Sequence, residues 1–546
     1  MADLIGTFGF LVVVLRAAIL CFQTVSIGGI LFLSLVTRKA ELRSEALLRA
    51  SWKLIRASAL ALATSQLLFV VTNSLVLTYS NDIPWQQVLS ANYVWAGALA
   101  VVGALALVFW PASLRRSVNP LAILPAGAML AASVMTSHSA SRMDDRLFLV
   151  SMTTLHYLAT AAWIGGLPYL LLSAKRTSGP ELKIQIARNF SRLAQISVAV
   201  LVLAGLAMSW IYVGSWDAIY GTAYGVMLSA KVVMLGLLLL LGAANYYIVR
   251  DLQSDSGTAA RSLFCFGEAE IGIGLTVILT AASLTAQPPA VDLTEDRVSL
   301  HQIAERYAPR WPRFSSPDLK DISPPTDEFV KRAAAQGRTI QTSFVPGGME
   351  IYTDTPADQA WSEYNHNCAG LVVFLMGILA LLSRSRYFSW AKIWPLSFLL
   401  LAVFLFFRAD PENWPMGPNG FWASFAVTDV LQHRIAVLLI IVFAVFQYRV
   451  ETKRVKSMAA ALVFPVVCAL GGAVLLTHTH ALANVKEELL IEMSHTPLAV
   501  FGIMAGWSRW LELRLPEENR AKKYLAWVWP VCFIMVGLIL MDYHES

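Results

Sequence analysis

Residues 193–213, LAQISVAVLVLAGLAMSWIYV, form an unbroken stretch without a charged side chain. As a helix this stretch would be about 30 Å long, which is the thickness of the hydrocarbon core of a bilayer. Stretches like it recur through the chain of 546 residues, in which 57% of the residues are apolar and only 14% are charged. A soluble domain carries roughly 25% charged residues and could not cover its surface with so few. The composition therefore predicts an all-α, polytopic integral membrane protein.

We expect about 14 transmembrane helices, eight before and six after a long polar stretch. The predicted spans lie near 6–36, 54–78, 92–112, 120–137, 148–173, 193–213, 225–249, 262–286, 368–383, 393–407, 433–448, 458–477, 495–511 and 524–541. The division predicts an eight-helix membrane domain (1–287), a linker or small cap (288–367) and a six-helix membrane domain (368–546). Within the polar stretch, RVSLHQIAERY (297–307) predicts a short amphipathic helix.

Basic residues are concentrated in alternate connections. Arg38, Lys39 and Arg43 follow the first span, whereas the next connection, SNDIPWQQVLSAN (80–92), contains no basic residue. Cytoplasmic loops of membrane proteins are enriched in Lys and Arg. The alternation therefore predicts that both termini and residues 288–367 lie outside the cytoplasm. The net charge of +6 needs no nucleic-acid partner to explain it.

The nine histidines all fall outside the cytoplasm on this topology, and six of them are at the outer ends of spans. Two clusters follow the same plan, with histidine where one span ends and again in the first turn of the next. The first is MTSHSA with MTTLHY, which contains Met135, His138, Met152 and His156. The second is LLTHTHA with EMSHTP, which contains His478, His480 and His495, with His433 as a further candidate. Taken singly, each histidine could also be an interfacial polar residue.

The residue types in the first cluster favour copper. The methionine and histidine are three apart in one segment and four apart in the other, which places thioether and imidazole on one helix face. Thioether and imidazole together suit Cu(I). We therefore predict that His138 and His156 share one metal site with Met135 or Met152, and that the second cluster is a separate metal site. The alternatives are methionines that only pack, histidines that cap helix ends, and paired imidazoles that hold haem.

Ionisable residues inside the predicted spans are a further signal, because each is costly in a bilayer. They are Arg16, Lys231, Glu268 and Glu270. Arg16 and Glu270 have similar predicted depths and could form a buried ion pair. The alternative is that these residues line an ion or proton path.

Several segments together resemble the bacterial copper resistance protein D (CopD) family. They are TSHSA, LHYLATAAWIGGL, YGVMLSAKVVMLGLLLLLGAANYY and GEAEIGIGLTVILTAASLTAQPPA. The resemblance implies that His138, His156, Trp163, Lys231 and Glu270 match the family's pattern. The C-terminal half resembles the six-helix extension of long members of the family.

The resemblance implies copper handling and transport across the bacterial inner membrane, through His/Met sites at the periplasmic face. It also implies periplasmic termini and a CopC-like periplasmic copper-binding partner. Two other functions remain open at this stage, a haem-binding electron-transfer protein and a membrane copper-site assembly factor or copper enzyme. The sequence contains no recognisable nucleophile–base pair or phosphate loop, which argues against an ATP-driven pump and favours a protein that is not an enzyme.

Overall fold

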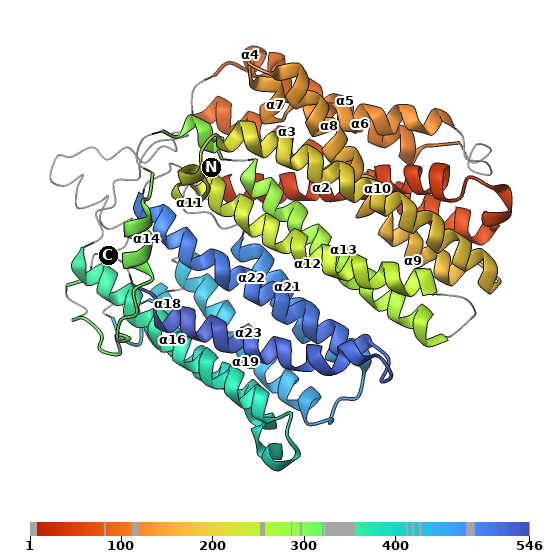
Figure 1. Cartoon of the computed structure of the whole chain (residues 1–546). Helices are drawn as coiled ribbons and strands as arrows, with labels where there is room; N and C mark the ends of the chain where they lie inside the picture. The colour runs from red at the N-terminus through yellow and green to blue at the C-terminus, as the bar shows by residue number, and fades with distance from the viewer. Residues whose placement is uncertain are drawn as a thin grey trace. The chain divides into compact units, whose positions relative to one another are not determined.

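A computed structural model of the chain describes residues 8–80, 83–111, 120–251, 257–285, 287–294, 297–318, 321–322, 355–410, 413–417, 420–424, 428–476 and 486–544 (Figure 1). Over these residues the regular elements are all helices. The chain divides into two compact units, which are treated separately below. Unit 1 comprises residues 1–297, 476–484 and 515–518, and unit 2 comprises residues 298–475, 485–514 and 519–546.

The predicted all-α polytopic membrane fold is confirmed. In the described part of the chain, 11 helices are long and apolar enough to cross a membrane, and α5 and α6 are shorter apolar helices. Every predicted span coincides with at least one helix. The number of 14 spans stays a prediction.

Unit 1 contains the helices of the N-terminal half. They are α2 (Phe8–Leu31, continued by a π-helical turn, Phe32–Val36), α3 (Glu45–Ser80), α4 (Trp85–Ser90), α5 (Asn92–Val108), α6 (Ile123–Met135), α7 (His138–Ser141), α8 (Arg146–Trp163), α9 (Leu167–Arg176), α10 (Pro180–Val213), α11 (Trp216–Gly221), α12 (Ala223–Asp251) and α13 (Gly257–Leu284). Helix α2 packs against α3, α6, α8 and α13, so it forms the centre of the unit. Helix α8 packs against α10, and α12 against α13.

Two glycines bring the backbone of α2 against the break between α8 and α9. A Cβ atom at Gly165 would lie 2.0 Å from the carbonyl oxygen of Thr24, and one at Gly28 would lie 2.3 Å from the carbonyl carbon of Gly165. No side chain fits at either position, because heavy atoms cannot approach so closely. The WIGGL segment therefore fixes α8 directly on the central helix.

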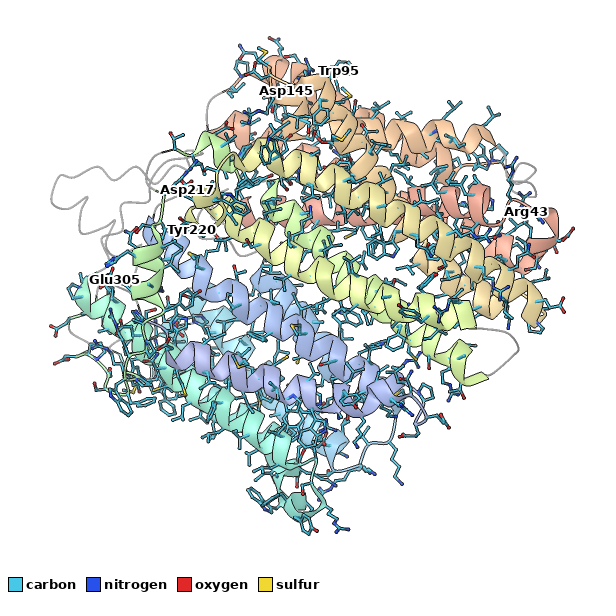
Figure 2. The ribbon with its side chains drawn as sticks, viewed as in Figure 1. Arg43, Trp95, Asp145, Asp217, Tyr220 and Glu305 are labelled. Atoms are coloured by element: carbon cyan, nitrogen blue, oxygen red, sulfur yellow. The ribbon has the colours of Figure 1, made fainter. Side chains whose placement is uncertain are left out.

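The two ends of unit 1 differ in charge. Figure 2 shows Arg43, from the basic connection after α2, at one end of the unit and Asp217 and Tyr220, on α11, at the other. At this second end Arg297 binds Asp217 (2.6 Å). A hydrogen bond from Ser215 and the Arg297 guanidinium hold the pKa of the Asp217 carboxyl below its usual range. These contacts fix the chain that follows α13 against the end of the unit where α6 and α8 meet α7.

Unit 2 contains the helices of the C-terminal half. They are α14 (Leu300–Arg306), α16 (Pro356–Leu382), the 3-10 segment η6 (Arg386–Leu396), α17 (Ser397–Arg408), α18 (Phe421–Ser424), α19 (Thr428–Glu451), α20 (Met458–Ala461), α21 (Val463–Leu475), α22 (Lys486–Arg514) and α23 (Arg520–Met541). Helix α16 packs along α23, and α22 packs between α21 and α23. The core between them is aromatic, with Trp394, Phe464 and Trp529 fully buried.

A buried ion-pair network holds one end of unit 2. Glu512 on α22 accepts hydrogen bonds from Arg384, from Arg509 (2.7 Å) and from the indole of Trp529 (3.0 Å). Arg509 also pairs with Glu451 of α19 (3.3 Å). Two guanidinium groups therefore face two carboxylates, which compensates the desolvation of each charge.

The predicted short helix in the polar stretch is confirmed as α14, which begins with a capping box between Ser299 and Gln302. Helix α16 starts at Pro356, well before the predicted residue 368, because Thr355 and Asp358 cap its first turn. Of the predicted linker 288–367, the described residues up to 294 belong to unit 1, and those from 298 onward belong to unit 2.

Candidate functional site

His138 is the first residue of α7 and lies at the end of unit 1 that holds Asp217. Its Nε2 is buried and has no hydrogen-bond partner among the residues that the structure describes. Burial lowers the pKa of this imidazole, and the positive charge of Arg16 lowers it further. Both effects favour the neutral ring, which is the form that binds metal ions.

Gln287 follows α13, and its backbone is close to the ring of His138. Its side-chain amide is a second unsatisfied group beside this ring. The side chain is 2% exposed, and neither its Oε1 nor its Nε2 has a partner within the described ranges. Burying an amide without hydrogen bonds costs roughly 1–3 kcal/mol. The sequence analysis did not select Gln287. The only sequence signal is a polar residue between an apolar span and two prolines.

A chain of short contacts leads from α7 to α8 and α10. The hydroxyl of Ser139 shares hydrogen bonds with Thr153 on α8 and with Tyr212 on α10 (2.7 Å to Tyr212). Thr153 in turn donates to the sulfur of Met208 on α10 at 3.3 Å. Met208 packs against a buried cluster that includes Tyr212 and Met227. The structure thus brings a thioether next to the segment that carries His138.

His156 lies one helical turn beyond Thr153 on α8. Its Nδ1 is buried and has no hydrogen-bond partner in the described part of the chain. Gly205 of α10 lies against the ring, so that a methyl group there would be 3.6 Å from Cε1. The ammonium group of Lys231 on α12 is within electrostatic range of the imidazole.

The predicted first-turn position of His156 is wrong. Helix α8 begins at Arg146, so His156 lies about 15 Å along the helix axis. The sequence contains no capping signal for a helix that begins at Arg146. Asp145, the residue before the helix, adopts a left-handed conformation, and its side chain does not cap the helix. His495 is likewise more than two turns into α22, which begins at Lys486.

The two methionines chosen from the sequence occupy less enclosed positions. Met135, at the end of α6, is 47% exposed, and Met152 on α8 is half-buried. Sequence spacing alone singled them out because each precedes a histidine by less than one turn. Met208 is distant in sequence from both histidines, and only the packing of α10 on α8 brings it near.

The ionisable residues in the spans of unit 1 do not pair as considered above. Arg16 donates from Nη2 to the backbone carbonyl of Thr136 at 2.9 Å. Glu270 is 2% exposed and accepts a hydrogen bond from Asn245. No ion pair joins Arg16 and Glu270 in the described structure, where Arg16 binds the end of α6 and Glu270 binds α12. Glu268 is half-buried two positions before Glu270 on α13.

The second histidine cluster is only partly described. His478 and His480 fall outside the described residues. His433, on α19, forms a pair with Asp410 (Nδ1–Oδ1 2.8 Å). His495 lies instead beside His366 of α16, with ring centroids 5.8 Å apart.

Over the residues that the structure describes, no group of three or more His, Cys, Asp or Glu side chains is arranged to hold a metal ion. A metal ion in this part of the protein would therefore have at most two ligands of these types, and any further ligand would be a thioether, an amide or a backbone group. The end of unit 1 with His138, Gln287 and Met208 offers such groups.

Comparisons with known proteins identify part of unit 1. Residues 184–284, which comprise most of α10 and the helices α11, α12 and α13, match the family described as "Copper resistance protein D". The chain is 32% identical to "Copper transport protein CutJ" of Bacillus subtilis (strain 168) over 163 residues, 29% of each chain. It is 25% identical to "Copper resistance protein D" of Pseudomonas syringae pv. tomato over 206 residues, 35% of this chain and 66% of that one.

The chain thus spans less than two thirds of the length of either relative. No solved structure matches it. Both relatives are named for copper and neither for haem, so the haem alternative has no support from them.

Proposed function

We propose that this membrane protein binds copper ions and carries them across the bacterial inner membrane; the match of residues 184–284 to the family described as "Copper resistance protein D" supports this. In this proposal the ion enters at the end of unit 1 that contains His138, and this end faces the periplasm, as do both chain termini. A CopC-like copper-binding protein would be the periplasmic partner.

The observation that carries the proposal is the pair of unsatisfied imidazole nitrogens. His138 Nε2 and His156 Nδ1 are both buried and without a partner in the described part of unit 1. Buried polar groups in proteins are nearly always hydrogen-bonded, so an ion bound at these two nitrogens would satisfy both of them. An imidazole nitrogen with a free lone pair is the commonest metal ligand in proteins.

The intervening contacts supply the route. Ser139 contacts Thr153, Thr153 contacts Met208, and Gly205, one turn before Met208 on α10, contacts His156. A copper ion could exchange imidazole for thioether and thioether for imidazole along this line without a bare intermediate. We propose that His138 and His156 bind the same ion in turn, rather than in the one shared site predicted from the sequence, and that Met208 is its sulfur ligand in place of Met135 or Met152.

The positive charges beside the route would limit how tightly the ion is held. Arg16 acts on His138 and Lys231 acts on His156. Conduction requires sites that an ion can enter and also leave. A cation beside each imidazole weakens binding and thereby favours release.

Proteoliposomes provide the test, with copper offered on one side and measured on the other. We expect His156→Ala to abolish copper movement and His138→Ala to reduce it at least about tenfold, as loss of metal-site groups does. His301→Ala is the matched control, because the His301 side chain is 81% exposed and pairs only with Glu305. Transport by both site variants at the parent rate, with unchanged thermal stability, would refute the proposed role of these histidines.

A further inference from the structure

We propose that His366 and His495 form a two-imidazole site for a monovalent copper ion in unit 2, separate from the route through unit 1. The assignment of copper rather than another metal rests on the proposed function. The site replaces the predicted partnership of His495 with His433.

The spacing of the two rings fits one shared ion. Their centroids are 5.8 Å apart and their planes are inclined at 86°. A metal bound by two imidazoles has two bonds of about 2 Å, and each nitrogen is about 1.1 Å from its ring centroid, so the limit for a straight arrangement is about 6 Å. The observed centroid distance lies within this limit, so one ion can bind both rings when a nitrogen of each ring is turned toward it.

The tautomer of His366 is already set for ligation. Its Nδ1 lies 2.8 Å from the backbone carbonyl of Ser362, one turn earlier on α16, and must donate to that oxygen. The lone pair is then on Nε2, for which the described structure contains no hydrogen-bond partner. Metal-binding histidines typically donate their other N–H to a backbone carbonyl or carboxylate in this way.

The aromatic ring of Tyr543 holds the imidazole of His366 in place. Tyr543 stacks on His366 with centroids 4.0 Å apart and lies 5.9 Å from the ring of His495. The amide of Asn367 donates to the carbonyls of Leu540 and Tyr543, at 3.0 and 2.9 Å. The end of α23 is thus fixed beside α16, and the imidazole of His366 has little freedom to turn away.

The positive charge of Arg306 near the site favours a monovalent metal ion over a divalent one. The guanidinium of Arg306 lies over the ring of Tyr543, 4.9 Å from its centroid, and donates to Ser494 beside His495. Its repulsion of a bound cation is proportional to the charge of that cation. A monovalent ion therefore suffers half the repulsion of Zn²⁺ or Cu²⁺. Structural zinc sites also need four ligands, and only two imidazoles are present here among the described residues. Imidazole is also a suitable ligand for copper.

The test is anaerobic titration of the purified full-length protein with Cu(I). We expect His366→Ala and His495→Ala each to lose one bound copper relative to the parent, and the double variant to lose no more than either single variant. His301→Ala, in the same unit but 81% exposed, should bind as many ions as the parent. Parent stoichiometry in both single variants would overturn the proposal.

A second measurement keeps the test valid if these variants fold poorly. In protein carrying His138→Ala and His156→Ala, X-ray absorption of the remaining copper should give two nitrogen ligands and no sulfur. Loss of all copper from that protein, or sulfur ligands, would refute the site. If the parent protein transports copper into proteoliposomes but His366→Ala still binds as many ions as the parent, the site at His366 and His495 is refuted and the proposed function stands. If the parent transports no copper but still binds one ion at His366 and His495, the proposed function is refuted and this site stands.

Discussion

The hydroxyl of Thr153 on α8 donates a hydrogen bond to the sulfur of Met208 on α10, with 3.3 Å between Oγ1 and Sδ. The contact orients a flexible thioether that would otherwise sample several rotamers. Thr153 also forms a hydrogen bond with Ser139, the residue after His138. Thr153 therefore connects the sulfur of Met208 to the segment that carries His138, the first ligand on the proposed route.

We predict that Met208→Leu lowers the affinity of the protein for Cu(I) by about tenfold or more. Leucine keeps the volume, so the cost in stability should stay under about 1.5 kcal/mol. Competition with a Cu(I) chelator measures the affinity. Met143→Leu is the matched control, because Met143 is 93% exposed. Equal affinity of Met208→Leu and parent would exclude the sulfur as a ligand.

We predict opposite effects of Gln287→Leu on stability and on copper. The buried amide makes no hydrogen bond within the described structure, so an apolar side chain should stabilise the copper-free protein by about 1–3 kcal/mol. The same change should weaken copper binding, because the amide is then missing beside His138. Thermal unfolding with and without Cu(I) measures both. A variant that unfolds at a lower temperature than the parent without copper would contradict this account of Gln287.

Glu512→Gln should destabilise unit 2 strongly. The substitution leaves Arg384 and Arg509 buried against a neutral partner, which typically costs about 3–5 kcal/mol. The control is Glu45→Gln, because the pair of Glu45 with Arg49 is about three-quarters exposed and should contribute under about 1 kcal/mol. Denaturation in mild detergent compares the two variants. Similar midpoints would mean that the buried network adds little.

Reporter fusions test the topology. We predict periplasmic signals from fusions after residue 320 and at the C-terminus, because basic residues are concentrated in the opposite set of connections. A fusion after Arg43, in the basic connection of unit 1, should report the cytoplasm. Cytoplasmic signals from both of the first two fusions would reverse the entrance of the proposed copper route.

The sequence predicts the helices of this protein well, since apolar stretches near 20 residues long carry a strong signal. It predicts their ends poorly. Helix α8 starts at Arg146 and α16 at Pro356, both outside the apolar stretches, because local capping and chain geometry decide a helix end.

The partners of the candidate residues could not be predicted either. His138 and His156 stood out because histidine is rare in this chain and the two belong to a similar pattern. Met208, Gln287 and His366 stood out in no pattern, and each becomes notable only through a neighbour far away in sequence. A buried amide without a hydrogen bond is a property of packing, which a sequence does not express.

The backbone contact between Gly28 and Gly165 restricts how unit 1 can move. The backbones of α2 and of the end of α8 contact each other directly, with no side chains between them that could repack. The two helices should therefore move together as one rigid body. The space beside the imidazole of His156 therefore depends on α10, whose Gly205 presents no side chain to the ring.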